Sequence, residues 1–106
     1  MNDPRSEIVF VAVDDTLVRS AGTKRIPMTA VADRVKALKH ASATLYCWST
    51  CGAEYAREAA VELDLEDCFV VFLPKPTVIL DDQAPADWRL CRYVHPFNVA
   101  SLETDP

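Results

Sequence analysis

Residues 8–16 (IVFVAVDDT) decide the fold that this sequence predicts. The first six residues of the stretch form an unbroken apolar run rich in β-branched side chains. Such a run is typical of a strand that is buried on both faces of a sheet. It stops abruptly at two aspartates and a threonine, where polar chemistry begins. The stretch therefore predicts a buried strand with Asp14, Asp15 and Thr16 at its carboxyl end.

Helical and strand patterns alternate along the rest of the chain. Apolar residues at helical spacing predict helices around residues 28–38 and 55–63, and the polar residues 19–27 predict a loop or small hairpin. Further strands are predicted at 44–48, 69–73 and 77–80, with an edge strand at 88–94. This order implies parallel strands joined by right-handed crossovers. We predict an α/β domain with a three-layer Rossmann-like sheet of about five parallel strands, the first strand central between those at 44–48 and 77–80.

Length and charge narrow the function classes. The chain has 106 residues and a net charge of −5, which predicts a single domain over residues 1–106 that binds neither nucleic acid nor membrane. Residues 1–6 lack an apolar leader, so we expect a cytoplasmic protein, and we expect residues 1–6 and 100–106 to be flexible.

The four cysteines and two histidines do not follow zinc-binding spacings, and we expect reduced thiols that mostly pack in the core.

Polar side chains follow each of the first four predicted strands. They are Asp14 and Asp15 after the first strand, Ser49 and Thr50 after the second, Lys75 after the third, and Asp81 and Asp82 after the fourth. In open parallel sheets, ligands bind beyond the carboxyl ends of the strands. Carboxylates suit Mg²⁺, and a lysine beside a helix N-terminus suits a phosphoryl group. Each residue alone is ordinary for a turn or helix cap, but together they predict a site for phosphoryl transfer.

The order and contexts of these residues resemble the four motifs of the haloacid dehalogenase-like superfamily, over about residues 8–82. In that family a first strand ends in Asp-x-Asp-x-Thr, whose first Asp attacks phosphorus and whose second is the general acid and base. The resemblance implies catalytic positions at Ala12, Asp14, Ser49 and Lys75, phosphate contacts from Thr16, Ser49, Thr50 and Lys75, and Mg²⁺ ligands at Asp14, Asp81 and Asp82. The loops after Thr16 and Ser49 are too short for a cap domain.

The sequence departs from the family at the nucleophile. Thr16 and Leu17 fix the register, which puts Ala12 where the attacking aspartate belongs. A methyl group cannot form an aspartyl-phosphate intermediate. The resemblance therefore implies a magnesium-dependent phosphatase-type domain that is inactive or strongly impaired. Its substrate would be a phosphorylated small molecule or macromolecule, and a homo-oligomer is left open.

Two other functional interpretations rest on the same residues. A non-catalytic module would keep the phosphate pocket and bind a phosphorylated ligand or a protein without turnover. A receiver-like domain also combines an acidic pair, a Ser or Thr and a Lys. Its third strand should end in Asp, however, whereas the third predicted strand here ends in Leu73 and Pro74.

Overall fold

The structure is a computed structural model that describes residues 7–102. It contains two α-helices, five strands and three short 3₁₀ helices within that range. In chain order these are β1 (Ile8–Ala12), β2 (Val18–Ala21), β3 (Lys24–Pro27), α1 (Thr29–His40), β4 (Thr44–Ser49), α2 (Ala53–Glu62), η2 (Glu66–Cys68), β5 (Val71–Pro74), η3 (Pro85–Asp87) and η4 (Pro96–Ser101). The α/β class that the sequence predicts is confirmed.

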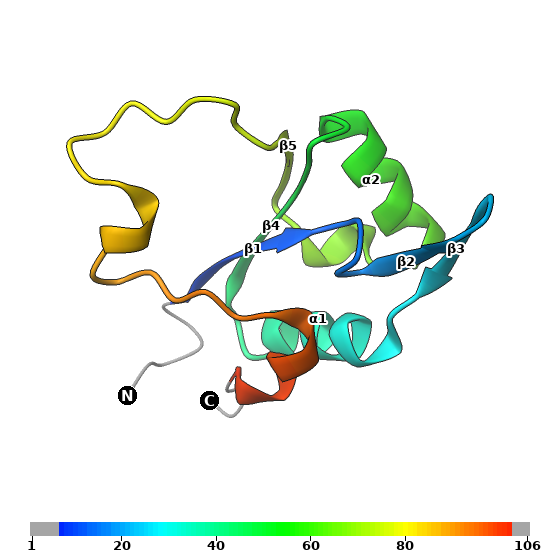
Figure 1. The fold of residues 1–106 in the computed structure, drawn as a ribbon. Coiled ribbons are helices and arrows are strands. Elements are labelled where there is room, and N and C mark those ends of the chain that lie inside the picture. Colours follow the sequence, from blue (N-terminus) through cyan, green and yellow to red (C-terminus); the bar gives the residue numbers. More distant parts are fainter. Residues whose placement is uncertain (1–6, 103–106) are drawn as a thin grey trace.

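Three parallel strands form the main sheet, in the order β1-β4-β5 (Figure 1). Ile8 lies level with Thr44 and Ala12 with Trp48, so β1 and β4 end at the same edge. β5 pairs with the other side of β4. The parallel strands predicted at 8–13, 44–48 and 69–73 are therefore present. The central strand is β4 and not β1, which corrects the predicted order.

Both α-helices pack on the same face of the sheet. Alternate residues of β4 are buried, including Leu45 and Cys47, and they join Val11 of β1 in one core with both helices. The helices contribute Val31, Val35 and Leu38 from α1 and Ala56, Ala59 and Ala60 from α2. A stripe of apolar side chains at helical spacing explains why each helix forms against this face.

The opposite face of β1 carries exposed apolar side chains. Ile8 and Phe10 are exposed, and the Phe10 ring stacks on Tyr46 of β4 with 4.8 Å between ring centroids. The prediction of a strand buried on both faces is therefore wrong for β1. The described residues form one helical layer against one sheet, because no helix of residues 7–102 covers the second face.

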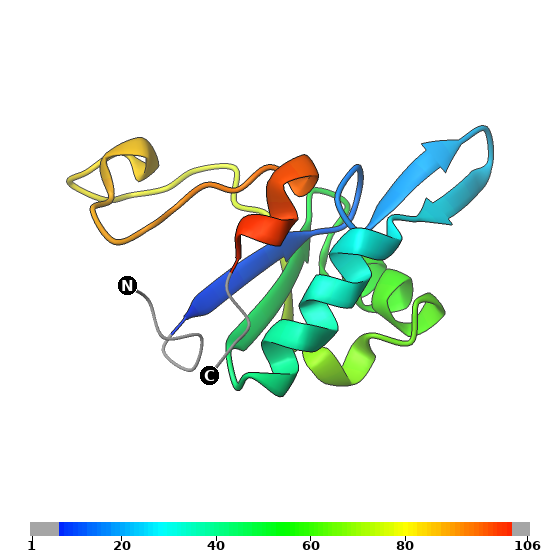
Figure 2. The ribbon, with the colours of Figure 1, turned by 90° about the horizontal axis from the view of Figure 1, so that it is seen from below.

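The strands predicted at 77–80 and 88–94 are not present. Residues 76–95 form an extended segment, which we call the arm, that projects away from the sheet in both views (Figures 1 and 2). The arm carries the short helix η3 and many exposed apolar side chains. An apolar run predicts a strand only if a neighbouring strand accepts its hydrogen bonds, and the arm has no such neighbour within residues 7–102.

Three smaller features complete the fold. The polar stretch after residue 18 forms the β2–β3 hairpin, which confirms the hairpin alternative. η4 packs against α1, and it includes Ala100 and Ser101, which were expected to be flexible. The same expectation for residues 1–6 and 103–106 concerns positions outside the described residues.

Among residues 7–102, no helix has the length and apolarity that a bilayer crossing requires.

The burial of Cys47 gives a direct chemical test of this core. Its side chain is fully buried, and burial raises its pKa to about 12. Since the thiolate is the reactive form, we expect iodoacetamide near pH 8 to label the exposed Cys51 and Cys91 and to leave Cys47 unmodified until the protein unfolds. Mass spectrometry of timed digests measures this. Equal labelling rates for Cys47 and Cys51 in the folded chain would show that the core is placed incorrectly.

Candidate functional site

A tight turn follows β1 and presents the two aspartates. The carbonyl oxygen of Val13 accepts hydrogen bonds from three backbone N–H groups, those of Thr16 (3.2 Å), Leu17 (2.9 Å) and Val18 (3.1 Å). Asp15 has φ of 58°, a left-handed conformation that aspartate tolerates better than most residues. Leu17 is completely buried and anchors the turn to the core. Asp14 and Asp15 are consequently exposed at the carboxyl edge of the sheet, with Thr16 half-buried beside them.

Asp14 is held by a tyrosine from α2. The Tyr55 hydroxyl donates a hydrogen bond to Asp14 Oδ1 at 2.7 Å. This bond to the carboxylate is the largest cause that raises the pKa of Tyr55 above its ordinary value. Arg25 of β3 lies over the Tyr55 ring, 5.2 Å from its centroid, and forms an ion pair with Glu62 at the end of α2. The hairpin, α2 and the turn after β1 are thus joined through one side-chain network.

The contact of Tyr55 with Asp14 could not be predicted from the helical pattern of the sequence. Its position matches the apolar face of a helix, so the pattern placed it with the packing residues Ala56 and Ala59. Helical periodicity records which face a side chain shares, but it does not show what the end of a long side chain reaches. The hydroxyl of a tyrosine on that face, one turn from a predicted phosphate-binding helix start, is the only local signal for this contact.

Ser49 is buried at the end of β4 and joins two motif positions. Its hydroxyl oxygen accepts a hydrogen bond from the Cys51 N–H at 2.9 Å. Its carbonyl oxygen accepts one from the Lys75 N–H, also at 2.9 Å. Gly52 then caps the start of α2 with φ of 106°, a backbone conformation that other residues rarely adopt. Thr50 is exposed in the same turn, so two of the residues predicted to contact phosphate, Ser49 and Thr50, directly precede the start of α2.

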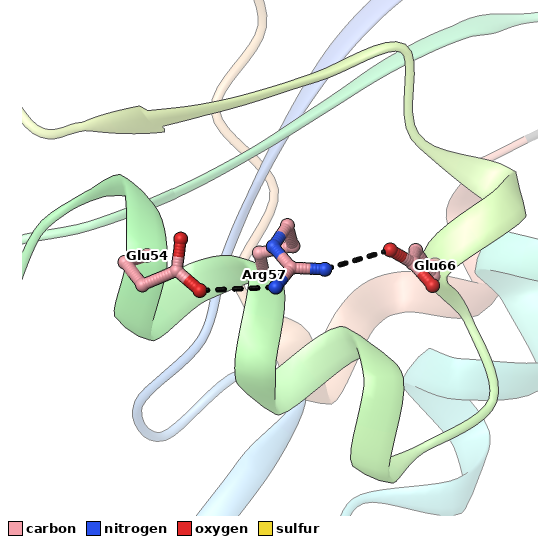
Figure 3. Close-up of polar contacts among 3 residues, drawn as sticks. All are labelled: Glu54, Arg57 and Glu66. Atoms are coloured by element: carbon pink, nitrogen blue, oxygen red, sulfur yellow. Dashed lines mark hydrogen bonds and ion pairs between the residues drawn. The ribbon is translucent and has the colours of Figure 1, made fainter.

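The first turn of α2 carries an acidic residue that a cation neutralises. Glu54 accepts a hydrogen bond from Arg57 at 3.1 Å, and Arg57 also binds Glu66 at 3.0 Å. Figure 3 shows Arg57 between the two carboxylates, on the outer surface of the helix. The two carboxylates raise the pKa of Arg57, Glu54 more than Glu66. Because Arg57 engages Glu54, the negative charge of that carboxylate opposes an anion at the start of α2 less strongly.

Three of the four motifs meet at one edge of the sheet. Ala12 is half-buried and lies level with Trp48, one residue before Ser49. Lys75 is half-buried and hydrogen-bonded to Ser49 through its backbone. Asp14 lies two residues beyond Ala12 and is tied to α2 through Tyr55. This cluster, Ala12, Asp14, Ser49 and Lys75, is what we call the edge site.

Asp81 and Asp82 do not join the edge site. Both are exposed on the arm, and the Asp81 carboxylate accepts a hydrogen bond from the Gln83 N–H at 2.9 Å. Within residues 7–102, no hydrogen bond or ion pair joins either aspartate to Lys75, and no three His, Cys, Asp or Glu side chains are grouped closely enough to hold a metal ion. The predicted ligand set of Asp14, Asp81 and Asp82 is therefore divided between the edge site and the arm.

No protein-family model, curated protein or solved structure matches the chain. The likeness to the haloacid dehalogenase-like superfamily stays a prediction from the motif residues. The residues at the positions of motifs one, two and three, far apart in the sequence, lie on adjacent strand ends.

The Tyr55 contact predicts a pH-dependent difference in stability. We expect Tyr55→Phe to lower the free energy of unfolding by at most about 1 kcal/mol near pH 7, because it removes one partly exposed hydrogen bond. The folded pKa of Tyr55 lies above its unfolded value, so its contribution is present below about pH 10 and is lost as the pH rises through the folded pKa. Urea unfolding near pH 7 and again above about pH 10 measures this difference. The control is Tyr93→Phe on the arm. Equal effects of the two variants would show that the hydrogen bond from Tyr55 to Asp14 does not stabilise the fold.

Proposed function

We propose that this chain is a phosphohydrolase-type domain of the magnesium-dependent, capless kind, with its nucleophile position occupied by Ala12. The observation that carries the proposal is the edge site. There Asp14, Ser49 and Lys75 come from three separate strand ends and lie beside the start of α2. A carboxylate, a hydroxyl, a lysine and free backbone N–H groups are the parts that phosphoryl transfer requires.

Each residue has a distinct task in this proposal. Lys75 and the start of α2 attract the phosphoryl oxygens, and the Ser49 hydroxyl donates to one of them. Asp14 holds or delivers a proton to the leaving oxygen, and Tyr55 fixes the orientation of that carboxylate. Ala12 supplies no group to attack phosphorus. The chain with Ala12 therefore binds the phosphoryl group and hydrolyses the phosphoester slowly or not at all.

The oxygen ligands on offer fit Mg²⁺ by their chemistry. The backbone carbonyl of Asp14 and the carboxylates of Asp81 and Asp82 are hard oxygen ligands, which suit this ion. Bound there, Mg²⁺ would supply positive charge to the phosphoryl oxygens. This fit requires the arm aspartates to reach the edge site.

The larger sheet belongs to the same proposal. If residues 77–80 pair in parallel with the free edge of β1, their carboxyl end brings Asp81 and Asp82 next to Asp14. A helix or partner on the exposed face of Phe10 would complete the three-layer Rossmann-like arrangement of about five strands. The open edge of β1 and the exposed apolar residues of the arm support this extension.

One experiment tests the proposal against the second candidate function. The second candidate is a module that binds a phosphorylated ligand or protein without turnover, and the observation that favours it is Ala12 itself. Hydrolysis of an aryl phosphate with Mg²⁺ is measured for the chain and for Ala12→Asp. Turnover only in the variant supports the phosphohydrolase lineage. Phosphate binding by both forms with turnover by neither supports the binding module.

The remaining expectations are part of the proposal. We propose a phosphorylated small molecule or macromolecule as the ligand, no nucleic-acid or membrane partner, and a cytoplasmic location. The net charge of −5 supports the exclusion of polyanionic partners.

A further inference from the structure

We infer that two copies of this chain exchange their arms, so that residues 77–80 of one copy pair with the free edge of β1 in the other. Asp81 and Asp82 of the exchanged arm then complete the edge site of the second copy. The completion of the site rests on the proposed function, whereas the exchange of arms does not.

β1 offers an open strand edge. Its only strand partner within residues 7–102 is β4, so the backbone groups on its other side have no strand to bind. Such an edge is a template for pairing with another strand, and proteins usually cover it or protect it with charge. The side chains next to this edge are apolar, with Ile8 and Phe10 exposed.

The arm offers a strand without a partner. Val78 is 80% exposed and Leu80 is 100% exposed, so these side chains bury almost no apolar surface in the single chain. The arm is nevertheless organised, since the Asp81 carboxylate accepts from the Gln83 N–H and the Trp88 Nε1–H donates to the Gln83 carbonyl at 3.3 Å. Exposed apolar residues grouped on one segment mark an interaction site.

The same chain cannot bring this segment to its own β1 while β5 stays paired. From Pro74, the end of β5, to Thr77 there are three Cα–Cα steps, which span at most about 11 Å. A strand added to the free edge of β1 would lie three strand spacings from β5, and a parallel strand must also return along the length of β5. Together these require about 18 Å. Parallel strands normally need a crossover of about a dozen residues for this reason.

A second copy removes this limit, because its position is not fixed by the connector. The arm projects from the end of β5 (Figure 1), and only near its far end does Arg92 form an ion pair with Glu7 at 2.7 Å. Pro74 and Pro76 stiffen the connector. Short, rigid hinges of this kind favour exchange of segments between chains. Both halves of the contact, an open edge and an unpaired apolar strand, are present on every copy. When two copies exchange their arms reciprocally, the two equivalent contacts are related by a twofold axis and close as a dimer, whereas one-way exchange would build an open chain.

Sedimentation equilibrium tests the exchange without any assumption about activity. We expect the full chain to form dimers, and we expect Leu80→Asp to raise the dimer dissociation constant at least about tenfold, because a charge replaces an apolar residue in the paired strand. Leu80 is fully exposed in the single chain, so the variant should fold normally. Val61→Asp, on the surface of α2, is the matched control and should leave the dimer intact. A chain that is monomeric at all concentrations, or a dimer that Leu80→Asp does not weaken, would overturn the inference.

Complementation tests whether the arm completes the partner's site. In the Ala12→Asp background, one variant carries Asp14→Asn and the other carries Asp81→Asn with Asp82→Asn. Each should be inactive alone. Co-refolded in equal amounts they should regain about a quarter of the parent activity, because half of the dimers are mixed and each of these has one intact site of two.

The outcomes separate the two proposals. If Ala12→Asp is active and the co-refolded mixture is not, the arm does not complete the partner's site, and the proposed function stands. If Ala12→Asp is inactive and folded, the proposed function fails, and the sedimentation result alone decides the exchange.

Discussion

Ala12→Asp is expected to raise magnesium-dependent hydrolysis of an aryl phosphate by about 10³-fold or more. Removal of a nucleophile from enzymes that use covalent catalysis costs several orders of magnitude, and the activity left comes from charge stabilisation and binding. The chain as written should show only that residual activity. The variant restores the attacking carboxylate at position 12.

The placement of residue 12 supports this expectation. Ala12 is the last residue of β1, and Asp14 lies two residues beyond it in the turn that follows. Ala12 is half-buried and level with Trp48, directly before the buried Ser49. A carboxylate at position 12 would therefore stand within the edge site, between Asp14 and the end of β4. Lys75 and a bound Mg²⁺ would offset the repulsion between the two carboxylates and keep the attacking carboxylate at position 12 ionised.

The controls separate chemistry from shape. Ala12→Asn introduces a side chain of nearly the same volume and polarity as Ala12→Asp, but it has no carboxylate to attack phosphorus. It should therefore stay as inactive as the chain with Ala12. Circular dichroism checks that all forms are folded. Absence of turnover by a folded Ala12→Asp across a broad phosphoester panel would contradict the phosphohydrolase proposal.

Leu17→Ala is expected to lower the free energy of unfolding by about 2–5 kcal/mol. Leu17 is 0% exposed and packs in the common core of β1, β4 and both helices. Its removal leaves a cavity beneath the turn whose N–H groups bind the Val13 carbonyl. A domain of this size has a total stability of about 5–15 kcal/mol, so the variant should be partly unfolded near physiological temperature.

Urea denaturation followed by circular dichroism measures this effect. Leu90→Ala is the matched control, because Leu90 is 95% exposed on the arm and outside residues 77–80. Its change should stay within about 0.5 kcal/mol. Equal losses at the two leucines would show that Leu17 does not anchor the turn after β1.

The local elements of the fold could be predicted from the sequence. The apolar runs gave β1, β4 and β5, and helical spacing gave α1 and α2 with the core faces that the structure shows. Polar residues at three strand ends also placed Asp14, Ser49 and Lys75 at one edge of a parallel sheet. These features depend on side-chain periodicity and turn chemistry, which are properties of short segments.

Only the tertiary structure decided which strands have neighbours and which faces are covered. Residues 78–80 form an apolar run as β1 does, yet they lie unpaired on the arm, because pairing depends on how far the connector after Pro74 can reach. Phe10 belongs to an apolar run but is exposed, because both helices pack on the other face. Tyr55 reaches Asp14 across 41 positions of sequence. Pairing, coverage and such long-range contacts are set by the position of the whole chain in space, which no local pattern records.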